Sequence, residues 1–162
     1  MPSLSPGSRA GIVILITGVV AIDQALKALV IRTLPLGATI ALLPGVLSLT
    51  HVHNPGVAFS LLPQVPALVP AAIVVALLFF LFYNDARWAR YPLMRRALAL
   101  LAGGAVGNLI DRVRLGAVID FIDLRVWPVF NLADIAVTTG AALLIVSLAT
   151  RTEVTPQTRG DR

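Results

Sequence analysis

Four long apolar runs restrict the possible folds of this chain more than any other feature. The clearest run covers residues 65–82 and carries no charged side chain, with Pro66 and Pro70 near its start, where a helix tolerates proline. A helix rises 1.5 Å per residue, so about 20 residues are needed to cross a hydrocarbon core of about 30 Å. A chain that is 57% hydrophobic and only 13% charged therefore predicts an integral membrane protein.

We expect an all-α membrane fold in one domain, 1–162, with four transmembrane helices. The expected spans are 10–31, 65–82, 96–113 and 132–149, and a polar tail follows at 150–162. No small-x-small cleavage site ends the first run before Asp23, which disfavours a removable signal peptide. Gly103 and Gly107 form a small-xxx-small pattern, which favours close approach of another helix.

The residues between the first two spans hold too many prolines and glycines for a continuous helix. Partial alternation and β-branched residues at 46–53 predict a small β-rich segment outside the membrane. Asn54 and the Pro-Gly pair ending at Gly56 then favour a tight turn. His51 and His53 are weak evidence for a metal because the chain has no further histidine and no cysteine, so we expect no metal ligands.

Arginines gather in the loop after the second expected span. This loop contains Arg87, Arg90, Arg95 and Arg96. Basic loops of membrane proteins tend to stay in the cytoplasm, so the formal charge of +5 indicates orientation and not a nucleic-acid partner. With four spans, both termini are then expected on the cytoplasmic side.

Polar residues interrupt the apolar runs at one level of the expected bundle. An Asp or Arg at a helix centre costs roughly 2.5 to 3.5 kcal/mol on insertion scales, so such residues indicate function. In the expected topology the outer helix ends carry Asp23, Asn108, Asp111 and Asp134. Both non-helical segments lie on this side, so we infer an outward-facing polar pocket.

Two carboxylates around one water are the chemistry that this pocket supports best. Two acids close together in a low dielectric cannot both ionise easily, so one stays protonated while the other accepts a proton from water. Asp120 and Asp134 are the best pair. Each also has a structural interpretation: Asn131 and Asp134 have the spacing of an N-cap and its N3 partner, and Asp120 could be a solvated loop acid. Serine chemistry is disfavoured because neither Ser48 nor Ser60 has an identifiable base.

Asp23 and Lys27 lie four residues apart on one face of the first expected helix, and Lys27 is the only lysine. The structural interpretation is a local ion pair at the membrane border. A place in the polar pocket is the alternative.

Five motifs occur in order along the chain. They are Asp23-Gln24-x-x-Lys27, Asn54-x-Gly56-x-Ala58-Phe59, Gly104-x-x-Gly107-Asn108-x-x-Asp111-Arg112, Val118-x-Asp120-Phe121 and Phe130-Asn131-x-Ala133-Asp134. Together they resemble those of the bacterial lipoprotein signal peptidases (signal peptidase II), four-span aspartyl proteases of the cytoplasmic membrane. Two departures are mild: Val57 stands where the family often has alanine, and the segment between Asp120 and Phe130 is short.

The resemblance implies that Asp120 and Asp134 are the catalytic pair. Residues implied to support the pair or the substrate are Asn54, Gly56, Asn108, Arg112, Asn131 and Lys27, with Asp23 and Asp111 in more structural roles. The implied substrate is a prolipoprotein, cut just before a diacylglyceryl-modified cysteine. We also expect contact with membrane lipid, no metal or organic cofactor, and a monomer in the inner membrane with its active site at the outer face.

Alternatives from other classes remain open at this stage. A small transporter also needs intramembrane acids, but would place them near the midplane and often shows internal repeats, which this sequence lacks. A structural membrane partner would explain the glycines and leave the acids unexplained. Another intramembrane aspartyl protease type bears a Gly-x-Gly-Asp motif, which is absent here.

Overall fold

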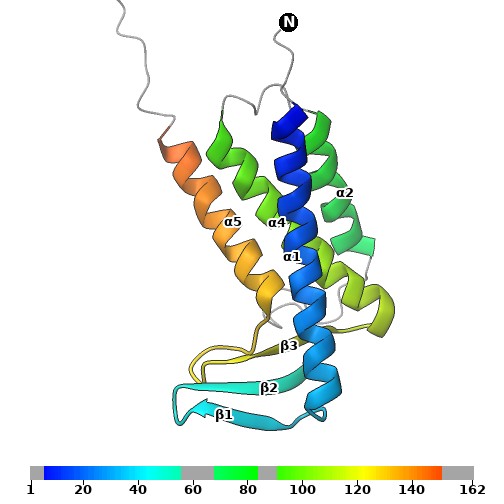
Figure 1. Ribbon diagram of the computed structural model, residues 1–162, viewed down its shortest axis with the longest axis vertical. Helices are drawn as coiled ribbons and strands as arrows, with labels where there is room; N and C mark the ends of the chain where they lie inside the picture. Colours follow the sequence, from blue (N-terminus) through cyan, green and yellow to red (C-terminus); the bar gives the residue numbers. More distant parts are fainter. Residues whose placement is uncertain (1–5, 56–67, 84–90, 151–162) are drawn as a thin grey trace, which may run out of the picture.

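Helices and a small sheet occupy opposite ends of the molecule (Figure 1). The structure is a computed structural model and describes residues 6–55, 68–83 and 91–150. Its helices are α1 (Pro6–Thr33), α2 (Leu68–Tyr83), α4 (Pro92–Leu115) and α5 (Leu132–Ala149). Its antiparallel sheet has the order β1-β2-β3, formed by β1 (Thr39–Leu43), β2 (Leu47–Asn54) and β3 (Val118–Asp123).

Three of the described helices are long and apolar enough to cross a membrane, namely α1, α4 and α5. The described part of α2 has 16 residues, which gives about 24 Å of helix. The prediction of a mostly helical membrane fold is thus confirmed. The span expected over 65–82, which would bring the number of spans to four, remains a prediction. Its first three residues lie outside the described part of the chain.

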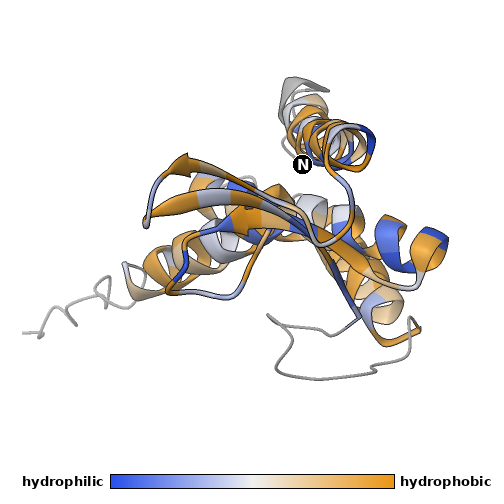
Figure 2. Cartoon of the chain, turned by 90° about the horizontal axis from the view of Figure 1, so that it is seen from below, coloured by the Kyte–Doolittle hydropathy of each residue, from blue (hydrophilic) through white to orange (hydrophobic). Residues whose placement is uncertain are grey.

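The outer surface of the helices is apolar. Ile14 of α1, Phe79 of α2 and Ile145 of α5 are each more than 60% exposed. Seen from the sheet end, the helices are coloured mainly as hydrophobic (Figure 2). Between them, small side chains such as Ala97 and Ala102 are fully buried. An apolar outer surface is suited to lipid, because apolar side chains lose nothing by facing hydrocarbon. The small residues between the helices let them approach closely.

Glycines set the spacing between α4 and its neighbours. A Cβ atom on Gly104 would overlap the main-chain carbonyl oxygen of Ala133 in α5. A Cβ on Gly140 of α5 would lie 2.7 Å from a carbonyl oxygen of α4. Three residues after Gly104 along α4, a Cβ on Gly107 would lie 2.8 Å from Oδ2 of Asp23 in α1. Glycine at these positions therefore brings α1 and α5 close to α4.

The sheet extends the predicted β-structure. A strand was predicted at 46–53, and β2 confirms it over Leu47–Asn54. The prediction confined β-structure to the segment between the first two spans, whereas β3 comes from the segment after α4 and pairs with β2. Nearly every residue of β3 is buried, so its sequence lacks the alternation that identifies a strand with one solvated face.

Candidate active site

Asp120 lies in the middle of β3, where the pairing with β2 sets its surroundings. Asn54 pairs with Val118, so Asn54 and Asp120 are diagonal neighbours across the two strands. The side-chain amide of Asn54 donates to Oδ2 of Asp120 at 2.8 Å, and that of Asn131 donates to Oδ1 at 2.7 Å. Asp120 is 2% exposed, so its interpretation as a solvated loop acid is wrong.

These surroundings tune the proton affinity of Asp120. Burial raises the pKa of Asp120 to about 7, and the nearby negative charge of Asp134 acts in the same direction. The amides of Asn54 and Asn131 stabilise the carboxylate and limit the rise. A carboxyl group that gains and loses its proton near neutral pH is suited to general acid or base catalysis.

Asp134 is the N3 residue of α5, and Asn131 is the N-cap. The side-chain oxygen of Asn131 accepts from the N–H of Asp134 at 2.9 Å, and Oδ2 of Asp134 accepts from the N–H of Asn131 at 3.3 Å. The capping box predicted from the spacing is confirmed. The other oxygen, Oδ1, accepts from the side-chain amide of Asn108 at 2.8 Å. Capping and membership of the polar site are therefore compatible for Asp134.

Asn131 joins the two acids. Its fully buried side-chain nitrogen lies within hydrogen-bonding distance of three oxygens: Oδ1 of Asp120 at 2.7 Å, Oδ1 of Asn108 at 3.0 Å and the carbonyl of Ile119 at 3.2 Å. Its main-chain N–H reaches Asp134. One residue thus holds the β3 carboxylate and the α5 carboxylate in a single network.

A buried cluster of charges adjoins this network. The ammonium of Lys27 lies 2.8 Å from Oδ2 of Asp23 and 2.7 Å from Oδ2 of Asp111, and it donates to Oδ1 of Asn108 at 2.9 Å. The ion pair predicted for Asp23 and Lys27 is confirmed, but both side chains are buried. Asp23 also accepts from the N–H of Ala133 at 2.9 Å, so α1 caps the first turn of α5.

Asp111 connects three elements. Its Oδ1 accepts from the side-chain amide of Gln24 at 3.0 Å, and its Oδ2 lies 3.3 Å from the N–H of Ile119 in β3. Since Lys27 and Gln24 belong to α1, Asp111 joins α1, α4 and β3. These contacts fit the structural role implied for Asp111.

Arg112 lies at the edge of the network. Its guanidinium donates to the carbonyl of Asn108 at 3.3 Å, and its charge interacts with Asp134 and Asp120. The side chain is half-buried. Gly56, the remaining implied site residue, lies outside the described residues.

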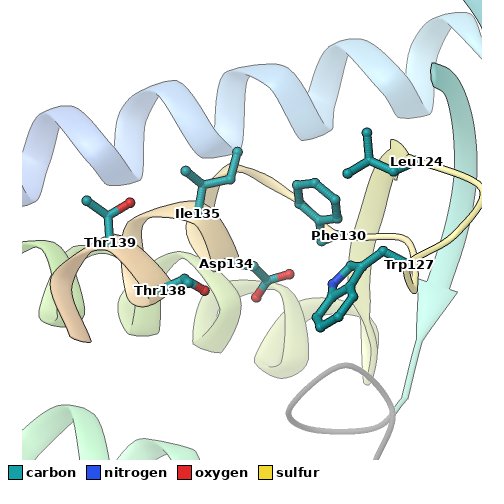
Figure 3. Close-up of a pocket in the computed structure, with 7 residues that line it drawn as sticks. All are labelled: Leu124, Trp127, Phe130, Asp134, Ile135, Thr138 and Thr139. Carbon is teal, nitrogen blue, oxygen red and sulfur yellow. The ribbon is translucent and has the colours of Figure 1, made fainter. Parts of the chain in front are cut away.

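A cavity of about 390 Å³ opens beside Asp134 (Figure 3). Its lining is otherwise mostly apolar and consists of Leu124, Trp127, Phe130, Ile135, Thr138 and Thr139. In the close-up, the Asp134 carboxylate lies among these side chains at the start of α5. One acid of the pair is therefore accessible from an apolar groove.

The described part of the chain contains no group of three or more side chains that could hold a metal ion. His51 lies in β2, where Nδ1 is 2.8 Å from the carbonyl oxygen of Leu34. His51 and His53 are near each other, with ring centroids 5.2 Å apart. Their arrangement adds nothing to the weak case for a metal made by the sequence.

Comparison with known proteins identifies the family. The family model for signal peptidase (SPase) II matches residues 15–150. A lipoprotein signal peptidase of Pelotomaculum thermopropionicum is 44% identical over 135 residues, which cover 83% of this chain and 89% of the relative. The chain belongs to the signal peptidase II family. A lipoprotein signal peptidase of Halothermothrix orenii is likewise 44% identical over 138 residues, 85% of this chain and 92% of that one.

The fold agrees with the family. A solved structure described as a bacterial membrane enzyme superposes with a TM-score of 0.82 at 30% identity, covering 94% of this chain and 95% of the other. The resemblance seen in the five motifs is confirmed. Signal peptidase II is a protease family, which decides against the transporter and structural-partner alternatives.

Several residues of the site were not predicted. Gln24 was noticed only as part of a motif, yet it binds Asp111 and lies 3.2 Å from the carbonyl of Gly107. The apolar lining of the cavity was also missed. A signal for part of it exists, because Thr138 follows Asp134 by four residues and so lies on the same face of α5.

Proposed function

We propose that this chain is a membrane aspartyl endopeptidase that removes the signal peptide from prolipoproteins by cutting before the diacylglyceryl-modified cysteine. Asp120 and Asp134 are the catalytic pair in this proposal. The observation that carries it is the position of Asn131, which hydrogen-bonds to both carboxylates. Relatives named lipoprotein signal peptidase supply the substrate class.

The chemistry follows from one proton shared by the pair. The ionised carboxylate takes a proton from a water molecule, and the oxygen of that water attacks the scissile carbonyl carbon. At the same time the protonated carboxyl donates its proton to the carbonyl oxygen. The tetrahedral intermediate then collapses: a hydroxyl proton returns to a carboxylate, the C–N bond breaks, and the leaving amine takes the other proton. A pKa of about 7 lets Asp120 serve in either role near neutrality, and the protonation states belong to the pair as a whole.

The supporting residues hold this pair in place. Asn54 and Asn131 donate to Asp120, and Asn108 donates to Asp134. Arg112 supplies a nearby positive charge. Gly56 is proposed to allow close approach of the substrate backbone, since glycine has no side chain to obstruct it.

The substrate is proposed to approach from lipid. The cavity beside Asp134 is largely apolar and lies at the start of α5, where the helices meet the sheet. A signal helix and acyl chains can therefore remain in hydrocarbon while the scissile bond reaches the polar network. Membrane lipid is thus part of the working environment.

The proposed topology has four spans, including α2, with both termini in the cytoplasm and the site at the outer face of the inner membrane. Arg95 and Arg96 begin α4 at the end of the bundle far from the sheet (Figure 1), and basic residues favour the cytoplasmic side. The proposed enzyme acts as a monomer, since the network described above is built from one chain.

The deciding experiment is cleavage of a diacylglyceryl prolipoprotein by the purified protein in lipid. The wild type is compared with Asp120→Asn and Asp134→Asn, and with a non-lipidated precursor as the second substrate. We expect each substitution to lower the rate by at least about 10³-fold, as for other groups that act as a unit, and we expect cleavage to require the lipid. Cleavage that survives both substitutions, or none by a well-folded wild type, would contradict the proposal.

A further inference from the structure

Lys27 occupies an unusual position among the basic residues of this chain. Every other permanently cationic side chain in the sequence is an arginine. Lys27 is 1% exposed, and its ammonium has three acceptors at 2.7 to 2.9 Å: Asp111, Asp23 and Asn108. An ammonium carries three N–H groups, so each can serve one of these acceptors.

The choice of lysine has a geometric reason. A guanidinium is a planar fork that suits two parallel bonds to one carboxylate, whereas an ammonium is a compact charge whose donors point in three directions. The three acceptors around Lys27 belong to two helices and come from separate side chains. One carboxylate already balances the charge of the ammonium, and two carboxylates are present. The third contact, to the uncharged Asn108, therefore needs its own explanation.

That third contact fixes the orientation of a side-chain amide. An ammonium can only donate, so the amide oxygen of Asn108 must face Lys27. The amide nitrogen of Asn108 then faces Oδ1 of Asp134, at 2.8 Å. The Asn108 oxygen that faces Lys27 also accepts from the side-chain amide of Asn131, and this amide donates to Asp120 as well. A reversed amide would direct its nitrogen at Lys27 and its oxygen at the Asp134 carboxylate.

We propose that Lys27 is a positioning residue for catalysis, which acts by holding the Asn108 amide so that its nitrogen faces Asp134 and its oxygen faces Asn131. This inference deepens the proposed function and rests on its assignment of Asp120 and Asp134 as the catalytic pair. Lys27 touches neither acid of the pair directly in the contacts described above. The charge of Lys27 also acts on Asp120 through space, and that effect does not need Asn108. The proposed positioning effect passes through Asn108 and disappears when Asn108 is removed.

Loss of Lys27 should impair the chemical step more than substrate binding. Without the ammonium, Asn108 keeps only Asn131 as a donor to its oxygen, and the donor to Asp134 is held less firmly. We expect Lys27→Met to lower kcat by about ten- to a hundredfold, as outer-shell partners of functional groups commonly do. KM should change less than about twofold, because an interaction needed only for the transition state leaves substrate binding intact.

The test is a double-mutant cycle on purified protein with the diacylglyceryl prolipoprotein substrate. The cycle comprises wild type, Lys27→Met, Asn108→Ala and the double variant. If Lys27 acts through Asn108, Lys27→Met changes kcat less than about twofold in the Asn108→Ala background. Arg114→Met is the matched control, because Arg114 is an exposed cation that contacts the same cluster only through Gln24, at 3.5 Å. This control should retain kcat within about twofold.

Removal of Lys27 alone leaves two buried carboxylates without their cation, which can prevent folding. In that case the cycle is measured in an Asp111→Asn background. The wild-type cluster has two acids and one base, and Lys27→Met with Asp111→Asn leaves one acid, so the net charge is unchanged. The introduced carboxamide keeps one acceptor oxygen for the N–H of Ile119.

The outcomes separate this inference from the proposed function. Three results would overturn the positioning role. Lys27→Met could lower kcat equally with and without Asn108, a folded Lys27→Met variant could keep wild-type kcat, or the substitution could raise KM alone. Inactive wild type, or activity that survives substitution of Asp120 and Asp134, would overturn the proposed function instead.

Discussion

The two acids of the site differ in the local structure that holds them. Asp120 lies on a strand and receives its two donors from asparagines of other elements. Asp134 lies in the first turn of α5, where the positive end of the helix favours a carboxylate. Asn131 contacts both. Two residues of the same type therefore have different surroundings. This difference separates their proton affinities, so that one acid can hold a proton while the other is ionised.

The pH dependence of cleavage should report the protonation of this pair. Because the pKa of Asp120 is raised to about 7, Asp120 is mostly neutral below that pH and ionised above it. Catalysis by the pair needs one proton, so we expect kcat/KM to decline as the pH rises above about 7. The measurement is a pH–rate profile between pH 5 and 9 with a substrate that does not titrate in this range. A profile that stays flat above pH 6 would contradict the expectation.

Arg112 should matter less than the acids. Its guanidinium donates to the carbonyl of Asn108, and its charge interacts with both carboxylates. Hydrogen bonds to charged groups contribute about 1.5 to 3 kcal/mol, so Arg112→Ala should lower kcat/KM by about ten- to a hundredfold. Steady-state kinetics of the purified variant measure this, with Arg114→Ala as the control on the same helix. Wild-type kinetics for Arg112→Ala would remove Arg112 from the site.

At the scale of elements, α4 is the centre of the bundle, because both α1 and α5 pack closely against it. The contact with α5 leaves no room for a side chain at Gly104. A side chain at Gly107 would likewise meet α1, at the buried carboxylate of Asp23. The position of α4 thus sets the distance between the charged cluster and the start of α5.

Gly104→Ala should therefore reduce stability and activity together. The added methyl group overlaps the carbonyl oxygen of Ala133, a main-chain atom that cannot move without shifting Asp134. Overpacking of this kind costs typically about 1 to 3 kcal/mol. Thermal unfolding in detergent and the cleavage assay are the measurements. Gly18→Ala is the matched control, because a Cβ there has no neighbour within 4 Å, and it should leave both unchanged.

The helices were largely predictable from the sequence. The span expected at 132–149 coincides with α5, and that expected at 96–113 lies within α4. Hydropathy alone misses the true ends of α4, which are set by Pro92 in the first turn and by Gly116, with φ of 72°, after the last. Strand β3 escaped prediction because burial of nearly all its residues removes the alternating pattern.

The residues of the site were more predictable than the hydrogen bonds between them. Charged residues in apolar helices are costly, so Asp23, Lys27 and Asp134 were candidates without any structure. The direction of each hydrogen bond was not predictable, since the contact of Lys27 with Asn108 joins residues 81 positions apart. The cavity lining was likewise hidden, because Trp127 and Thr138 meet only when the segment after β3 folds beside α5.

At the scale of the whole molecule, the charged cluster and the two acids of the site are buried, and large apolar side chains of the helices are exposed. A soluble protein shows the opposite distribution, with its charges outside. The polar network lies where the helices meet the sheet, so water can approach from that end while the helix flanks face lipid.

The proposed topology predicts labelling from opposite sides. Because the chain has no cysteine, single cysteines can be introduced on an otherwise unreactive background. Val126→Cys, at a position 91% exposed beside the sheet, should react with a membrane-impermeant thiol reagent in intact cells. Thr150→Cys, just after α5, should react only after the membrane is permeabilised. The reverse pattern would place the site in the cytoplasm.

The ion pair within α1 has a consequence for biogenesis. Synthesis proceeds from the N-terminus, so α1 exists before Asp111, Asn108 and the start of α5 have been made. In that interval Asp23 and Lys27, four residues apart, neutralise each other inside their own helix, which spares α1 the insertion of an uncompensated charge. Asp134 arrives only with α5. In the proposed mechanism, a nascent chain therefore lacks a complete catalytic pair until its last described helix has been made.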